Sequence, residues 1–219
     1  MTNLIVISSE TSIKDETAVV NDLFHAGLRL FHLRKPGFSF GDQCHYLNLI
    51  EEKFRDKISV HQNYETVNEF GLMYFHVKEK DRQLIAHKDL QSNTDLTPSQ
   101  EVLLELLETQ GKKKSTSFHD YTDLQFESHH WNYCFFGPVF NSISKADYKS
   151  TLNKDFHNEG DLYQRVFALG GLTKDTIEIA FRKEFYGAAV LGTIWSEPSK
   201  AIEKFKELEL ICRQNVHTY

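Results

Sequence analysis

A short polar stretch that follows an apolar run offers the clearest chemistry in this chain. Residues 133–136 read Tyr-Cys-Phe-Phe and predict a buried strand, which a Gly-Pro pair then ends. Ser142, Ser144 and Lys145 come next. Two hydroxyl groups, nearby backbone N–H groups and one cation could bind an anion such as a phosphate. Taken alone, the same residues could equally form an ordinary polar loop.

The chain has a regular framework that could position such residues. Short β-rich runs alternate with amphipathic helical stretches along its 219 residues. This alternation predicts a parallel sheet, and eight units in this length favour the α/β class and a (β/α)8 TIM barrel, with a doubly wound open sheet as second choice. Strands are expected at 4–8, 28–34, 58–61, 73–77, 115–119, 132–137, 166–170 and 187–191, and helices at 17–26, 40–54, 64–70, 98–109 and 202–212.

No linker rich in Pro, Gly or Ser divides the chain, so we expect a single barrel domain over residues 1–219. The connection 78–114 between the fourth and fifth strands is long and polar. We expect it to contain one helix and, at 111–114, a solvated turn.

Composition excludes several classes of function. The formal charge of −6 argues against general nucleic-acid binding, which requires a basic surface. The first residues lack a basic region and predict a strand rather than a signal peptide, and no apolar run reaches the length of a membrane helix. The three cysteines are widely scattered, which is typical of reduced thiols in a cytoplasmic protein.

Histidines end four consecutive predicted strands. In a (β/α)8 barrel the functional site lies at these carboxyl ends, which here contain His32, His61, His76 and His119. His32 has the same parity as Arg34, so both side chains are expected to point into the barrel mouth. His76 is expected to be a structural residue, whereas Arg34 is expected to contact a ligand.

Glycines end the seventh and eighth predicted strands, at Gly170-Gly171 and Gly192-Thr193. Glycine there lets backbone N–H groups approach an oxyanion, and these two loops are the usual phosphate site of the fold. Metal hydrolysis is an alternative of a different class, because histidines at strand ends can bind Zn²⁺. The first strand has no His-x-His and the eighth ends in no catalytic Asp, which weighs against it.

Several segments together resemble one family, thiamine phosphate synthase and its relative TenI, a thiazole tautomerase. Residues 137–145 are similar to the family's Gly-Pro-(Ile/Val)-(Phe/Tyr)-x-Thr-x-Thr-Lys, 168–172 to its Ala-Ile-Gly-Gly-Ile, and 187–190 to its Gly-Val-Ala-Val. Residues 31–34 and 117–119 match less specifically. The resemblance runs from the first strand to the last.

The resemblance implies a (β/α)8 enzyme of thiamine biosynthesis whose small-molecule partner is thiazole phosphate. The residues that would line its phosphate pocket are Ser142, Ser144, Gly170, Gly171, Gly192 and Thr193. Lys145 would reach toward a diphosphate, and Ser117 and His119 would lie near the reacting ring.

The chain departs from the synthase pattern on the diphosphate side. The family's Gln-x-Arg-x-Lys after the second strand is replaced by His32, Arg34 and Pro36, so one lysine is lost. The adjacent Lys35 has the opposite parity to His32 and Arg34, which makes it a doubtful substitute. The family's Asn-Asp after the third strand is replaced by a His-Gln pair that ends at Gln62. A neutral amide cannot balance the charge of Mg²⁺ as a carboxylate does.

The second Mg²⁺ carboxylate of the synthase falls near Asp81, but Lys78-Glu79-Lys80 replaces the spacer before it. Because the thiazole-phosphate half is retained and the diphosphate half is eroded, we favour a TenI-like tautomerase, which requires no cofactor. A synthase with Mg²⁺ is the alternative, and a non-catalytic thiazole-phosphate binding protein is a further one.

The catalytic candidates are His32 and His61, followed by His119, because histidine titrates close to working pH. The histidine credited with catalysis in TenI is replaced here by Pro138. Neither nucleic acid nor a membrane is an expected partner. The sequence leaves the oligomeric state open, including a homodimer.

Overall fold

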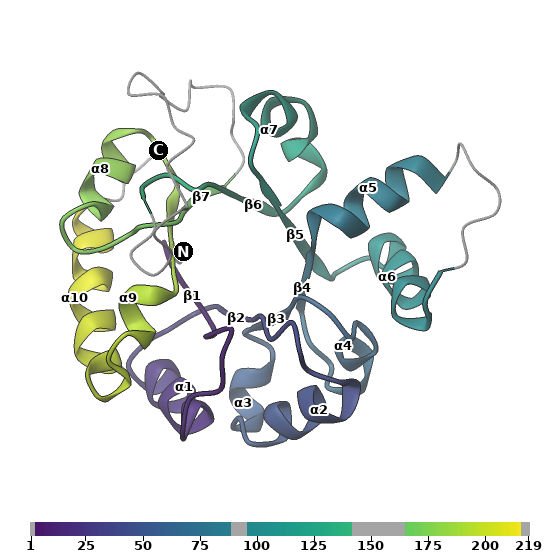
Figure 1. Ribbon diagram of the computed structural model, residues 1–219, viewed down its shortest axis with the longest axis horizontal. Coiled ribbons are helices and arrows are strands. Elements are labelled where there is room, and N and C mark those ends of the chain that lie inside the picture. Colours follow the sequence, from purple (N-terminus) through teal and green to yellow (C-terminus); the bar gives the residue numbers. More distant parts are fainter. Residues whose placement is uncertain (1–2, 89–95, 142–164, 216–219) are drawn as a thin grey trace.

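The computed structural model describes residues 3–88, 96–141 and 165–215. Within these ranges, eight strands pair in parallel in chain order, and β8 pairs with β1 to close a barrel that helices surround (Figure 1). The predicted (β/α)8 fold is confirmed. The strands are β1 Leu4–Ile7, β2 Phe31–Leu33, β3 Ile58–Val60, β4 Tyr74–Val77, β5 Lys113–Phe118, β6 Tyr133–Phe136, β7 Val166–Leu169 and β8 Gly187–Val190.

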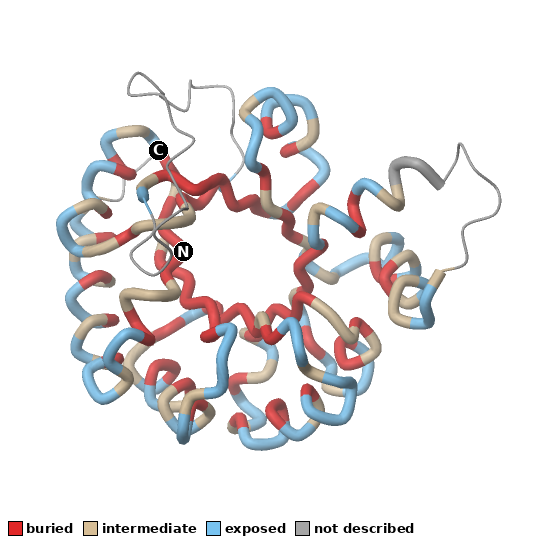
Figure 2. The backbone as a smooth tube through the Cα atoms, viewed as in Figure 1, coloured by how far each residue is buried: buried red, intermediate tan, exposed pale blue. Residues whose placement is uncertain are grey.

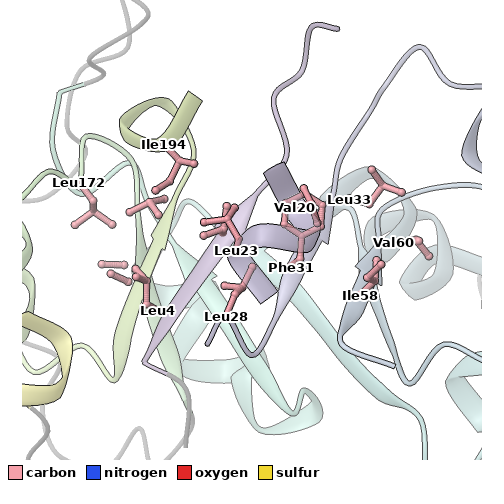
Figure 3. Packing of buried hydrophobic residues seen from close by; sticks show 14 of the residues in the cluster. Leu4, Val20, Leu23, Leu28, Phe31, Leu33, Ile58, Val60, Leu172 and Ile194 are labelled. Atoms are coloured by element: carbon pink, nitrogen blue, oxygen red, sulfur yellow. The ribbon is translucent and has the colours of Figure 1, made fainter. Parts of the chain in front are cut away.

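Alternate residues of each strand face opposite sides of the barrel wall. On β2, Phe31 and Leu33 belong to the large apolar cluster that also contains Val20 and Leu23 of α1 (Figure 3). A smaller apolar cluster has the opposite parity and fills the interior, with Ile5, Ile7, Leu30, Tyr133, Phe135, Phe167 and Ala189. Buried residues accordingly trace the ring of strands, whereas exposed residues lie on the outer helices (Figure 2). This alternation fixes which strand residues can reach a site inside the barrel.

The helices lie outside the barrel in the described part of the chain (Figure 1). They are α1 Glu16–His25, α2 Phe40–Asn48, α3 Glu52–Arg55, α4 Glu65–Glu69, α5 Glu79–Lys88, α6 Pro98–Glu108, α7 Tyr121–Glu127, α8 Ile177–Arg182, α9 Gly192–Trp195 and α10 Ala201–Gln214. None of those within the described ranges has the length and apolar character needed to cross a membrane.

Three expectations about local structure were wrong. The connection after β4 contains two helices, α5 and α6, and α5 was missed because its sequence is too polar to show a helical apolar stripe. Lys113 and Lys114 do not form a solvated turn, because they open β5 and pair with Tyr74 and Phe75.

The single helix expected over 40–54 is divided into α2 and α3. The side chain of Asn21 bridges the break, because its Nδ2 donates to Leu49 O and its Oδ1 accepts from Glu51 N, both at 3.0 Å. Since Asn21 belongs to α1, this division depends on a tertiary contact that local periodicity does not reveal.

Candidate functional site

A cavity of about 510 Å³ opens at the carboxyl ends of the strands. Its wall contains residues that were expected at a ligand site, namely Arg34, Ser117, His119, Gly170, Gly171, Gly192 and Thr193. Ser142, Ser144 and Lys145 lie outside the described residues, so their contact with an anion stays a prediction.

Close backbone contact joins the segment after β6 to the one after β7. Val139 N donates to Leu169 O at 2.8 Å, and Phe140 N donates to Gly170 O at 3.2 Å. Gly171 has a φ of +64°, and a Cβ there would lie 2.4 Å from Asn141 O. Only glycine permits both this conformation and this approach. Residues 139–141, which precede the polar stretch, are thereby held against the glycine pair.

We expect Gly171→Ala to lower the free energy of unfolding by about 1–3 kcal/mol, because the new methyl group forces the two segments apart in a disfavoured backbone conformation. Urea denaturation followed by circular dichroism measures this change. Gly37→Ala is the matched control, because a Cβ at Gly37 meets no atom within 4 Å, and it should change stability by less than about 0.5 kcal/mol. Equal effects of the two substitutions would contradict the packing argument.

Backbone donors line the same side of the cavity. Within the described chain, the N–H groups of Gly171, Gly192 and Thr193 donate to no protein acceptor. The hydroxyl of Thr193 instead donates to Leu172 O. Thr193 can therefore offer a ligand its N–H while its side chain fixes the loop. Backbone N–H groups in the wall of a cavity are suited to an oxyanion.

His119 supplies an imidazole to the wall of the cavity. Its Nδ1 lies 2.6 Å from Gly137 O, a carbonyl that can only accept a hydrogen bond. In the neutral ring, Nδ1 therefore carries the proton and Nε2 keeps its lone pair. Nε2 lies 4.0 Å from Glu79 Oε2, beyond hydrogen-bonding distance, and the side chain is 44% exposed. This arrangement leaves Nε2 able to accept a proton from a ligand.

Arg34 lines the cavity and forms an ion pair with Glu10, which also lines it. Ser9, Glu10 and Thr11, which follow β1, were missed as site residues. Their polar run at the carboxyl end of the first strand was the available signal. Ser117 also lines the cavity, and its Oγ lies 3.2 Å from His76 Nε2.

His32 and His61 lie deeper than the cavity wall. Inside the barrel His32 Nδ1 is 2.8 Å from His61 Nε2, and His32 Nε2 is 2.7 Å from the hydroxyl of Tyr133. Burial, with the neighbouring charges, lowers the pKa of both imidazoles well below the usual value and that of His76 to about 3. His32 is inside the barrel as its parity predicted. His76 is buried, as expected of a structural residue.

The comparisons with known proteins agree with this architecture. No protein-family model matches the chain. The thiamine-phosphate synthase of Lysinibacillus sphaericus is 22% identical in an alignment that covers 94% of this chain and 94% of that one. This confirms the resemblance to the thiamine phosphate synthase/TenI family.

Solved structures support the same barrel. Thiamine phosphate pyrophosphorylase from Bacteroides thetaiotaomicron superposes with a TM-score of 0.70 and 22% identity over 99% of this chain and 100% of that one. The pyrophosphorylase from Pyrococcus furiosus also gives 0.70, with 13% identity over 98% and 97% of the two chains. At these identities the structural matches establish the fold alone.

The described residues do not fit the Mg²⁺ site that the family's synthase pattern implies. Asp81 is buried and accepts hydrogen bonds from Tyr64 at 3.4 Å and Gln100 at 3.2 Å. Gln62 donates its amide to backbone carbonyl groups. Neither lines the cavity, and the carboxylate that does so in the described chain is that of Glu10, which is paired.

Proposed function

We propose that this chain is a thiamine-pathway enzyme that binds thiazole phosphate in the cavity and catalyses a TenI-like tautomerisation of the thiazole ring. The observation that carries this proposal is the presence, in one cavity, of the glycine loops after β7 and β8 and of the His119 imidazole. The reaction requires the protein to bind the phosphate group of the substrate and to provide a side chain that transfers a proton.

The phosphate would bind at the glycine loops. The N–H groups of Gly171, Gly192 and Thr193 are available there, and charge-assisted hydrogen bonds from backbone donors stabilise a phosphate without a protein cation. Lys145, Ser142 and Ser144 would add the remaining contacts if they behave as the family pattern implies.

His119 would carry the proton. With Nδ1 fixed on Gly137 O, Nε2 can take a proton from one position of the non-aromatic thiazole tautomer and return it at another. His32 and His61, which the sequence favours, are buried and do not line the cavity, so the geometry favours His119.

A synthase that couples hydroxymethylpyrimidine diphosphate to thiazole phosphate is the second candidate. The name of the curated relative favours it. It would require Mg²⁺, which stabilises a departing diphosphate, but the lack of fit described above makes it the weaker candidate. Binding of thiazole phosphate without turnover is the third.

The deciding experiment supplies the purified protein with the non-aromatic thiazole tautomer and, separately, with both coupling substrates and Mg²⁺. We expect accelerated aromatisation in the first reaction. Thiamine phosphate formed at an ordinary enzyme rate in the second would overturn the preference for a tautomerase. Tight binding of thiazole phosphate with neither reaction accelerated would identify a binding protein.

His119→Asn should lower kcat for tautomerisation by about 10²–10⁴-fold, the usual contribution of a positioned acid–base group. The affinity for thiazole phosphate, measured by calorimetry, should change by less than about threefold, because the phosphate binds elsewhere in the cavity. His25→Asn is the control, since His25 is exposed on α1 and pairs with Glu51. Full activity of His119→Asn would show that another group carries the proton.

A further inference from the structure

Three histidines inside the barrel form a cluster that the proposed reaction does not use. His32 on β2, His61 directly after β3 and His76 on β4 come from neighbouring strands, and each is at most 4% exposed. One ring nitrogen from each lies within 4.8 Å of those of the other two. We propose that this cluster binds one transition-metal ion of the zinc class, with the three imidazoles as its ligands.

The spacing suits such an ion. Zn–N bonds of about 2.0–2.1 Å place the nitrogens of a tetrahedral site about 3.3 Å apart. The distances in the cluster lie on both sides of this value. His32 Nδ1 and His61 Nε2 are 2.8 Å apart, and the three ligand atoms all lie within 4.8 Å of one another. His61 and His76 are stacked, with ring centroids 4.1 Å apart and ring planes at 24°, so one of these two rings must turn out of the stack before both nitrogens face the ion.

The short contact between His32 and His61 requires one proton between the two ring nitrogens. Two imidazole nitrogens at 2.8 Å must include one that carries a proton and one that accepts it. A metal ion that replaces this proton binds both nitrogens through their lone pairs. Each imidazole keeps its other nitrogen for an outer partner.

Outer partners are in place for two of the rings. A metal-bound histidine normally donates its second N–H to a fixed acceptor. His32 Nε2 lies 2.7 Å from the Tyr133 hydroxyl, and His76 Nδ1 lies 2.9 Å from Ser115 Oγ. The other nitrogen of His76, Nε2, lies 3.2 Å from Ser117 Oγ, which is the longer of the two contacts of this ring. To coordinate the ion, His76 Nε2 would give up this contact with Ser117.

Burial keeps the three imidazoles neutral, the state in which they are ligands, although the positive charges of Arg34 and Lys78 also help to lower the pKa of His61 and His76. The nearby cations Arg34 and Lys78 each have a carboxylate partner, Glu10 and Asp81 respectively. Neutral imidazole donors favour Zn²⁺, Co²⁺, Ni²⁺ and copper over Mg²⁺ and Ca²⁺.

The test is metal binding by the full-length, untagged protein after treatment with a chelator, and its readout does not depend on any enzymatic activity. With a water molecule as the fourth ligand, one equivalent of Co²⁺ should give the d–d absorption of a tetrahedral site, and Zn²⁺ should then displace the Co²⁺. X-ray absorption of the Zn²⁺-loaded wild-type protein should show histidine imidazole ligands and requires no variant. Absence of binding at micromolar metal, or a purely oxygen-ligated spectrum, would overturn the proposal.

Substitutions locate the ion. His61→Asn and His76→Asn, checked for folding by circular dichroism, should each weaken Co²⁺ affinity by about tenfold or more. The matched control is the double variant His129→Asn/His130→Asn, because these adjacent residues lie outside the cluster, with ring centroids 3.8 Å apart. Loss of binding in the control with retention in His61→Asn would place the metal elsewhere. If neither cluster variant folds, the ligand count from the wild-type absorption spectrum decides.

Discussion

Between pH 6 and pH 5, the free energy of unfolding of the metal-free protein should fall by about 3–4 kcal/mol. His32, His61 and His76 remain neutral in the folded state because burial lowers each pKa. In the unfolded chain the same groups regain pKa values of about 6.5 and take up protons. At a pH where only the unfolded state binds the proton, each such group lowers the free energy of unfolding by about 1.4 kcal/mol for every unit that the pH falls.

The sign follows from the direction of the shifts. Because the folded pKa values are depressed, the stabilisation is complete above the unfolded pKa and is lost as the pH falls toward the folded pKa, which for His76 is about 3. Glu16 acts in the opposite direction, because its pKa is raised, chiefly by burial. It involves at most one proton, against three from the histidines, so it offsets only a minor part of the loss.

Urea denaturation at pH 5, 6 and 7, in the presence of a chelator, measures this dependence. His76→Gln should reduce the slope of unfolding free energy against pH by about a third, because one titrating group has been removed. His129→Asn, at an exposed position outside the barrel, should leave the slope unchanged. Equal stability at pH 6 and pH 5 would show that the histidines are protonated in the folded protein.

The fold and one half of the site could be predicted from residue order alone. Strand parity placed His32 inside the barrel and Phe31 outside, and the carboxyl-end rule placed the glycine pairs at the cavity. These predictions depend only on strand geometry and on the closure of eight parallel strands.

What the sequence could not predict depends on contacts between distant residues. The break between α2 and α3 requires the Asn21 side chain, and the convergence of three histidines on one point depends on the register of β2, β3 and β4. Depth inside the barrel also separated His119, at the cavity wall, from His61 beneath it. Strand-end position gives no measure of that depth.

Lys35 has the opposite parity to Arg34 and is not among the residues that line the cavity, but parity did not reveal what it contacts. Its ammonium group forms a buried ion pair with Glu16, and the two side chains are 3% and 5% exposed. Lys35 Nζ also donates to Thr11 O at 2.9 Å, and the hydroxyl of Tyr46 lies 3.4 Å from the same carboxylate. The pair thus joins the segment after β2 to α1 and to the cavity-lining segment after β1.

Glu16→Gln and Lys35→Met should each lower the free energy of unfolding by about 3–5 kcal/mol, because each leaves a buried charge without its partner. The double variant Glu16→Gln/Lys35→Met should be more stable than either single variant, since it removes both charges. Urea denaturation of the four proteins gives the coupling energy.

The exposed pair of Arg182 and Glu178 provides the control, and Glu178→Gln should cost less than about 1 kcal/mol. Single substitutions at Glu16 and Lys35 that cost no more than this control would show that the pair is hydrated. In that case, the segments after β1 and β2 would be held mainly by their backbone hydrogen bonds.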